Sequence, residues 1–217
     1  MAKYVDLSRE IYTGMPTFTE DSKPAVISNN DIESVGYNIT LMVLSSHLGT
    51  HFDAPWHFIP TGLTVDQVPP EQFIGEAFKV DLRHKKPKEL ITVEDLLPHQ
   101  DRVVKGAKII LHTGWDKVYP QKSYFSDMPR MSLELARWLA DREIGLLGLD
   151  IPTPTPEYPM VRDIHVALLQ GGMVIVEALC NLEQVDAKFF LIAPPLALRG
   201  RDGSPVRAIG ACGLTVN

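Results

Sequence analysis

The 217-residue sequence contains few cysteines, no run of basic residues and no long apolar segment. Its two cysteines, Cys180 and Cys212, are too few for a disulfide framework, and the apolar neighbours of each indicate small hydrophobic packing residues. A catalytic thiol at either position is the alternative. Because no apolar run approaches the roughly 20 residues that cross a bilayer, we expect no membrane partner.

The charge balance excludes another class of partner. The sequence has 21 Lys and Arg against 27 Asp and Glu, a net charge of −6, which argues against binding to nucleic acid. The polar start of the chain lacks the apolar segment of a secretory signal, so we expect a cytoplasmic protein that acts on a small molecule. With 45% hydrophobic residues, a chain of this length can bury one sizeable core. We therefore expect a single domain over residues 1–217.

Three of the seven histidines lie close together, with an aspartate between the second and the third. His47 and His51 are four residues apart and Asp53 follows two residues later, so two imidazole nitrogens and a carboxylate oxygen can converge on one divalent cation such as Zn²⁺ or Mn²⁺. His57 follows Asp53 by four residues. The alternative, ordinary surface or hydrogen-bonded core histidines, accounts well for a single histidine but poorly for this density. The pattern predicts a metal site.

The segment that carries these residues is unlike a regular helix. Gly49 and the β-branched Thr50 disfavour a helix, and Pro55 biases the residue before it away from helical dihedral angles. Upstream, residues 37–45 alternate between large apolar and mostly polar side chains, which predicts a strand with one buried face. We expect the histidine cluster at the end of a strand that runs into a shaped loop.

The run His47-Leu-Gly-Thr-His51-Phe-Asp53-Ala-Pro-Trp-His57-Phe resembles the signature of the metal-dependent cyclase-family hydrolases. That family includes bacterial kynurenine formamidase (arylformamidase) and isatin hydrolase, and the resemblance extends over essentially the whole chain. It implies an α/β domain of the swivelling β/β/α type with a mixed sheet and few helices. It also implies a divalent metal, zinc with manganese as the alternative, one or two ions per chain, and assembly as a homodimer or homotetramer.

A second group of candidate ligands lies in the last third of the chain. Glu177 is an acid within an apolar run, where a charged carboxylate is costly unless it is paired or bound to metal. His165 and Glu177 match the family's second ligand pair in spacing. The resemblance then implies that Asp53 bridges a second ion held by His165 and Glu177. It leaves His57 free of metal as the proton shuttle, since an imidazole with a pKa near 6.5 can both accept and return a proton.

Three further positions are candidates for the site. Phe18 matches the aromatic residue that lines the substrate pocket of formamidases, although Thr19, Glu20 and Asp21 replace the Pro-Gly-Asp that follows it there. His112 is predicted to be structural or to position other groups, with a direct metal role as the alternative. Asp150 follows a short apolar run, where it either caps a turn or belongs to the site.

Two helices are predicted from local signals. Residues 132–141 form the clearest helix, with Ser132 as its cap and leucines and alanines on one face. A shorter helix that carries His165 is expected to begin at Asp163 and to stop at Gly171 and Gly172.

Three classes of function are compatible with these residues. The first is a metal-dependent hydrolase of the carbon–nitrogen bond in an aryl formamide such as N-formylkynurenine or in a related cyclic amide. The second is a metal-dependent cyclase or lyase that acts on a small carbonyl compound, and the third is a non-catalytic metal-binding protein. His57 argues against the third, because a structural metal site needs closed coordination and no spare base.

Overall fold

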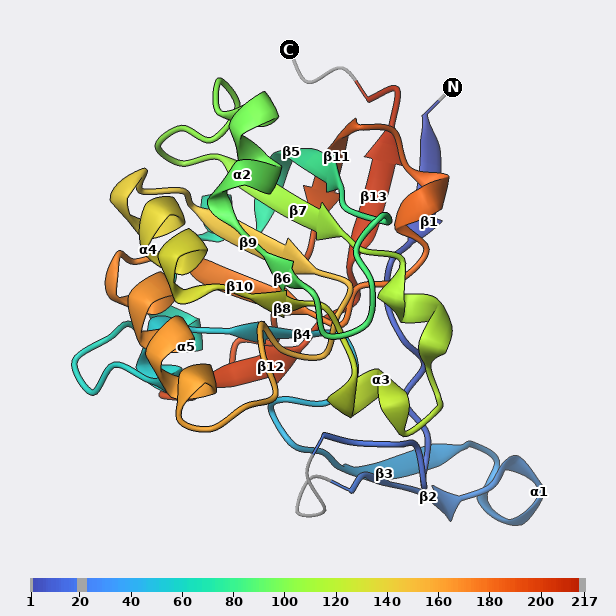
Figure 1. The fold of residues 1–217 in the computed structure, drawn as a ribbon. Coiled ribbons are helices and arrows are strands. Elements are labelled where there is room, and N and C mark those ends of the chain that lie inside the picture. Colours follow the sequence, from blue (N-terminus) through green and yellow to red (C-terminus); the bar gives the residue numbers. More distant parts are fainter. Residues whose placement is uncertain (1, 19–22, 215–217) are drawn as a thin grey trace.

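The computed structural model describes residues 2–18 and 23–214. Its centre is a nine-stranded mixed sheet with the strand order β1-β13-β11-β5-β7-β9-β10-β4-β12 (Figure 1). These strands are β1 (Lys3–Asp6), β4 (His51–Asp53), β5 (Ile74–Asp81), β7 (Lys108–His112), β9 (Leu146–Leu149), β10 (Val174–Glu177), β11 (Lys188–Ile192), β12 (Gly203–Pro205) and β13 (Ile209–Cys212). The first and last strands of the described chain, β1 and β13, pair with each other.

The remaining elements are small. Two-stranded sheets are formed by β2 (Ala25–Asn30) with β3 (Ile39–Val43), and by β6 (Leu90–Ile91) with β8 (Arg130–Met131). The α-helices are α1 (Ile32–Val35), α2 (Val93–Leu96), α3 (Ser123–Ser126), α4 (Leu133–Asp141) and α5 (Met160–Gln170). Short 3₁₀ helices are η2 (Pro55–His57), η3 (Val65–Gln67), η4 (Pro70–Gln72), η5 (Leu97–His99), η6 (Trp115–Val118) and η7 (Leu182–Gln184). The expected α/β architecture, with a mixed sheet and few helices, is confirmed.

The middle of the sheet is buried on both faces. β5, β7, β9 and β10 run parallel to one another, and their apolar residues divide between two hydrophobic cores. On β7, Ile109 and Leu111 pack in the core that includes α4 and α5, whereas Ile110 packs with Phe52 and Phe189 on the opposite side. Parallel strands covered on both faces read as continuous apolar runs, which is the pattern of these segments.

Helix α4 begins and packs as its sequence predicts. The Ser132 hydroxyl accepts a hydrogen bond from the backbone N–H of Leu135 at 3.1 Å, so it satisfies one of the free donors of the first turn. Leu135 and Leu139 are fully buried, and α4 lies beside α5 (Figure 1). The predicted cap and apolar face are both confirmed.

Helix α5 begins earlier than predicted. It starts at Met160, directly after Pro159, and Asp163 lies in its first turn, so the prediction that Asp163 caps the helix is wrong. Proline suits the start of a helix because the N–H that it lacks would have no intrahelical partner there. The predicted stop is correct, since the helix ends at Gln170 before Gly171 and Gly172.

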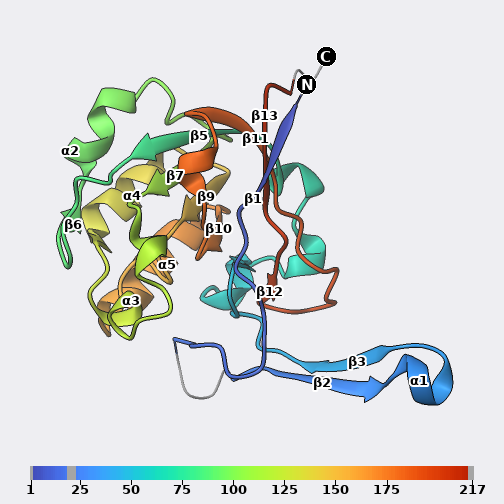
Figure 2. The same ribbon diagram turned by 90° about the vertical axis from the view of Figure 1, so that its right-hand side faces the viewer.

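The hairpin of β2 and β3 projects from the body of the molecule, with α1 at its tip (Figures 1 and 2). β3 forms within the predicted strand, but all five of its residues are exposed, so the prediction of one buried face is wrong. The physical reason is that β3 pairs only with β2, and within the described residues no other layer covers either face.

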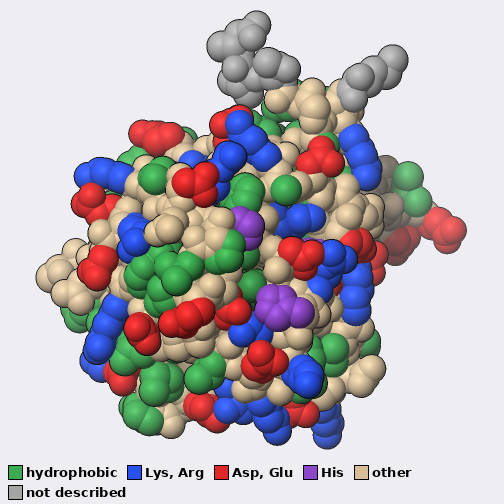
Figure 3. All heavy atoms as spheres, turned by 45° about the horizontal axis from the view of Figure 1, so that its top comes forward, with side chains coloured by type: hydrophobic (Ala, Val, Ile, Leu, Met, Phe, Trp, Pro, Cys, Tyr) green, Lys and Arg blue, Asp and Glu red, His purple; other side chains and the backbone are tan. Residues whose placement is uncertain are grey.

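Among the described residues, no helix combines the length and the apolar character needed to cross a bilayer. On the face drawn in Figure 3, acidic and basic side chains are interspersed, without a large area of one sign.

Candidate metal centre

Strand β4 places two of the predicted ligands at the centre of the site. It lies between β10 and β12 and runs antiparallel to both, and His51 pairs directly with Glu177 of β10. Because side chains alternate along a strand, His51 and Asp53 share one face while Phe52 enters the core on the other. His47 precedes β4 in a turn, so the cluster spans a turn, a short strand and a 3₁₀ helix rather than a regular helix.

The side chains of five predicted ligands converge. His47 Nδ1 lies 2.8 Å from Asp53 Oδ1, and His51 Nε2 lies 3.4 Å from the same oxygen. His51 Nε2 is also 3.3 Å from Glu177 Oε2. His165, from helix α5, places its Nε2 3.4 Å from Glu177 Oε1 and 3.8 Å from Asp53 Oδ2. The two carboxylates therefore lie among three imidazoles, and each carboxylate directs one oxygen to His51 and the other to His165.

Backbone carbonyls fix the orientation of two of the rings. Nδ1 of His51 donates to the carbonyl oxygen of Gly49 at 3.0 Å, and Nδ1 of His165 donates to that of Val161 at 2.7 Å. Both rings therefore present Nε2 to the carboxylates. A partner on the second ring nitrogen is the usual arrangement of a metal-ligating histidine, because it sets the tautomer and the ring plane.

Asp202 performs the same task for His47, and the sequence analysis missed it. Its Oδ2 lies 2.7 Å from His47 Nε2, which leaves Nδ1 of His47 facing Asp53. The next residue, Gly203, allows this contact, since a Cβ there would lie 2.9 Å from His47 Cε1 and 2.7 Å from the carbonyl oxygen of Phe52. In the sequence, Asp202 is a single acid before Gly203, and nothing near it indicates that it would contact His47.

Negative charge dominates this cluster. Burial alone would lower the pKa of His47, but the Asp53 charge and the hydrogen bond with Asp202 outweigh it and raise this pKa to about 9. The pKa values of His51 and His165 are also raised, because the attraction of the adjacent carboxylates outweighs burial. For Asp53, burial is outweighed by His47 and the pKa is lowered. Without a metal, protons on the histidines thus balance the negative charge of the carboxylates. A bound cation would balance that charge in their place.

Two buried oxygens point to a cation in this cluster. Among the residues that the structure describes, Asp53 Oδ2 and Glu177 Oε1 are buried without a hydrogen-bond partner, which is costly for carboxylates. A divalent ion satisfies such oxygens, and imidazole with carboxylate is a donor set that suits Zn²⁺ and Mn²⁺. His47, His51 and Asp53 have ligand atoms close enough to hold one ion. The residues present therefore fit a divalent metal.

His57 lies beside the ligands at the end of η2. Its ring stacks on that of His47, with the two centroids 3.9 Å apart, and its Nδ1 lies 3.7 Å from Asp202 Oδ2. Burial lowers the pKa of His57 to about 4, so the ring is neutral near pH 7. His57 also has a ligand atom close enough to those of Asp53 and His165 for the three to hold a metal ion. Its predicted role as a metal-free proton shuttle therefore stays a prediction.

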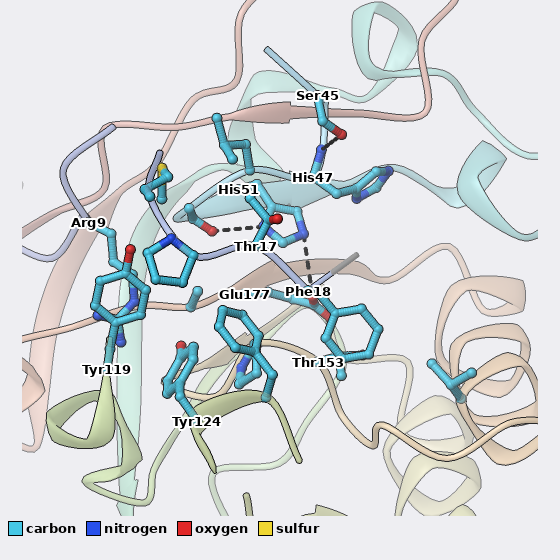
Figure 4. A pocket seen from close by; sticks show the side chains of 18 of the residues that line it. Arg9, Thr17, Phe18, Ser45, His47, His51, Tyr119, Tyr124, Thr153 and Glu177 are labelled. Carbon is cyan, nitrogen blue, oxygen red and sulfur yellow. Dashed lines mark hydrogen bonds and ion pairs between the residues drawn. The ribbon is translucent and has the colours of Figure 1, made fainter. Parts of the chain in front are cut away.

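The ligands line one end of a cavity of about 350 Å³ (Figure 4). His47, His51, His57, His165 and Glu177 all reach it. Its other walls are largely apolar and aromatic, and they include Phe18 at the position predicted to line a substrate pocket, together with Phe58, Tyr124 and Phe125. Thr19, Glu20 and Asp21 lie outside the described residues. Metal ligands beside an apolar cavity are typical of a site for a small molecule.

His112 and Asp150 lie away from this cavity. His112 is buried at the end of β7 and belongs to none of the metal-ligand groups found among the described residues. Asp150 accepts hydrogen bonds from the backbone N–H and hydroxyl of Thr113 and from the N–H of Gly114. Asp150 therefore holds the turn that follows β7, as its turn-cap interpretation predicted.

The cysteines also lie outside the cavity. Cys212 is buried on β13, and burial raises the pKa of the Cys180 thiol to about 11, which keeps it protonated. Neither residue lines the space beside the histidines. The structure thus gives no support to a catalytic thiol at this cavity.

Fold and site together define an enzyme of the metal-dependent hydrolase class, as predicted. A sequence model of the Cyclase family matches residues 5–155, so the chain belongs to that family. A kynurenine formamidase from Erythrobacter litoralis (strain HTCC2594) is 30% identical over 94% of this chain and 91% of its own length.

Solved structures agree with this assignment. A potential metal-dependent hydrolase with cyclase activity has a TM-score of 0.83 at 25% identity, covering 99% of this chain and all of its own. Isatin hydrolase A from Labrenzia aggregata shares the fold with a TM-score of 0.88 at 24% identity, covering 98% of this chain and 94% of its own. The cyclase-type fold expected from the resemblance is confirmed.

Proposed function

We propose that the protein hydrolyses the carbon–nitrogen bond of an aryl formamide such as N-formylkynurenine, or of a related cyclic amide. The observation that carries this proposal is the placement of a metal donor set and a neutral histidine at one end of an aromatic-walled cavity. A relative named kynurenine formamidase that aligns over nearly the whole chain supports the choice of bond.

We propose zinc as the ion, with manganese as the alternative. His47, His51 and Asp53 would hold one ion, and Asp53 would share a second with His165 and Glu177. The free Oδ2 of Asp53 and Oε1 of Glu177 support the second position, because both oxygens lie toward His165 Nε2. When bound, an ion of this kind activates water and polarises a carbonyl group.

His57 would move the proton in this reaction. Its Nδ1 lies toward Asp202, which leaves Nε2 to accept a proton from water and to return it to the departing nitrogen. A pKa lowered to about 4 keeps the ring neutral and ready to accept at pH 7. The aromatic side chains of Phe18, Phe58 and Phe125 would pack against the substrate ring.

Metal-loaded protein tested with N-formylkynurenine, isatin and a simple cyclic amide checks the proposal. We expect turnover of at least one of them and loss of turnover after chelation of the metal. Absence of turnover with all three, in protein whose metal content has been measured, would overturn the proposal.

A second candidate, a cyclase or lyase reaction, is favoured by the cyclase activity attributed to one structural neighbour, and product analysis in the same assays distinguishes it.

We further propose that the chain works in the cytoplasm on a small molecule, without nucleic acid or a membrane as partner. The net charge of −6 and the interspersed charges on the face drawn in Figure 3 support this. Two free cysteines suit a reducing compartment.

Self-association as a dimer or tetramer is also proposed, through the projecting hairpin. Eight large hydrophobic side chains between residues 27 and 43 are 46–61% exposed. An isolated two-stranded hairpin is marginally stable in water, and an exposed apolar area of this kind marks an interface. Its only charges, Asp31 and Glu33, lie near the tip, so an uncharged surface such as the same hairpin of a second copy suits it.

Sedimentation should give a dimer or tetramer for the wild type and a smaller species for Leu41→Asp. A monomeric wild type would overturn this proposal.

A further inference from the structure

The cavity has a cationic residue at a distance from the metal ligands. Arg9 lines the same cavity as His47 and His51, from the loop that follows β1. Figure 4 places Arg9 and Tyr119 at one end of the cavity and His47 toward the other. A molecule that fills the space therefore meets the metal ligands at one end and a guanidinium at the other.

The guanidinium of Arg9 is held in place without an anionic partner. It lies over the rings of Tyr119 and Tyr124, with Cζ 4.3 Å and 4.7 Å from their centroids. Its Nη2 donates to the backbone carbonyl of Asp116 at 3.2 Å, while Nε is buried and has no acceptor in the part of the chain that is described. Within the described part of the chain, no carboxylate lies within ion-pair distance of Arg9.

The carboxylate of Asp116, whose backbone carbonyl Arg9 contacts, does not pair with the guanidinium. Its Oδ2 accepts from the backbone N–H of Asn181 and pairs with Lys117 at 3.1 Å, while Oδ1 is buried with no hydrogen-bond partner among the described residues. A guanidinium has five N–H donors, and stacking on rings satisfies none of them. A cation that is partly removed from water and lacks an anion is costly, so Arg9 is prepared for an acceptor that the described residues do not supply.

We propose that Arg9 is a specificity residue that binds a carboxylate of the substrate. The proposal rests on the proposed function, since it places the amide bond at the metal ligands and the carboxylate at Arg9, with an apolar or aromatic body between them. A planar carboxylate matches the guanidinium fork and gains charge-assisted hydrogen bonds. Neutral amides leave the guanidinium unpaired, so the cavity favours amides that carry an acid.

Formanilide and its 2-, 3- and 4-carboxy derivatives test this with the metal-loaded enzyme. The wild type should prefer at least one carboxylated compound over formanilide by tenfold or more in kcat/KM. Arg9→Met should lower kcat/KM for that compound at least 30-fold, and at least tenfold more than it lowers kcat/KM for formanilide. Arg9→Lys should retain part of the preference, because it keeps the charge and loses the fork. Equal kcat/KM for carboxylated and neutral substrates in the wild type would overturn the proposal, whether or not Arg9→Met folds.

Arg142→Met is the matched control. Arg142 also stacks on an aromatic ring, with Cζ 3.6 Å from the Trp138 centroid, and donates to a backbone carbonyl, that of Trp138. The Arg142→Met variant loses the same charge and the same kind of contacts as Arg9→Met, but Arg142 does not line the cavity. Its substrate preference should equal that of the wild type. A matching loss of preference in this variant would mean that the effect of Arg9→Met is not local, which would also overturn the proposal.

A binding experiment separates this proposal from the proposed function. Calorimetry with anthranilate, a carboxylated aromatic amine, should show at least tenfold weaker binding to Arg9→Met than to the wild type, with both proteins metal-loaded. If no amide is hydrolysed but anthranilate binding depends on Arg9, the proposed function fails and the anion site stands. If amides are hydrolysed and neither binding nor preference depends on Arg9, the anion site fails alone.

Discussion

Nε2 of His47 lies 2.7 Å from Oδ2 of Asp202, although 155 positions separate the two residues in the sequence. The contact holds the imidazole so that Nδ1 faces Asp53 Oδ1 at 2.8 Å. Ser46, the residue before His47, also donates its hydroxyl to the Asp202 carboxylate. Asp202 therefore orients a predicted ligand without belonging to the predicted ligand set.

Replacing Asp202 tests this orientation. Asp202→Asn should weaken zinc binding about 10- to 100-fold, because a partner on the second ring nitrogen fixes the tautomer of the ligating histidine. Competition with a coloured chelator measures the affinity directly. Asp101→Asn is the control, since Asp101 is an exposed carboxylate that pairs with the adjacent Arg102 and with no metal-site residue. Unchanged affinity in Asp202→Asn would contradict the assigned role.

Variants of Glu177 and His51 test how many metal ions each chain binds. If Asp53 bridges two ions, Glu177→Ala should roughly halve the metal bound per chain and leave the ion at His47 in place. His51→Ala should lower metal content further and abolish turnover, because His51 contacts both carboxylates. Elemental analysis of the three proteins gives the stoichiometry. One ion per chain in both the wild type and Glu177→Ala would favour the single-metal arrangement.

Loss of His57 should reduce the rate and leave metal loading unchanged. General acid–base assistance contributes about 10²–10⁴-fold, or about 3–5 kcal/mol of barrier. His57→Asn should therefore keep its metal and lose at least two orders of magnitude in kcat. Added imidazole should restore part of the activity of His57→Ala by supplying the missing base. A variant that loses its metal instead would make His57 a ligand.

Removal of the metal should make stability depend on pH in a defined window. In the metal-free protein the pKa of His47 is raised from 6.5 to about 9, so the folded state binds a proton that the unfolded state releases. This contribution is complete below pH 6.5 and is lost as the pH rises through 9, a difference on the order of 3 kcal/mol.

Thermal unfolding at pH 6, 7.5 and 9 checks this sign. The melting temperature of chelator-treated protein should fall across the series, whereas metal-loaded protein should change much less because the ion replaces the protons. A parallel decrease in both forms would show that the site is not the cause.

Local sequence signals predicted the local parts of this structure. Ser132 and a stripe of leucines specify α4 within ten residues, and the spacing of His47, His51 and Asp53 places three donors within reach of one another. These features depend on neighbours in the chain. Propensity, capping and spacing therefore suffice to predict them.

The remaining features depend on tertiary structure. Alternation along β3 predicted a buried face, but a period of two does not reveal whether another layer covers the strand. Asp202 and Arg9 acquire their partners from segments far away in the sequence, and neither acid nor base stands out in its own stretch. A single charged residue without a nearby pattern carries no information about the side chain that it will meet.

Strand β4 lies between strands that are made much later, since β10 and β12 follow it by more than a hundred residues. During synthesis, His47, His51 and Asp53 thus leave the ribosome long before Glu177 and Asp202. The predicted ligands and the residue that orients His47 come together only after β10 and β12 have both paired with β4. We therefore expect tight metal binding only after these strands have paired, so metal affinity reports the docking of β10 and β12 on β4.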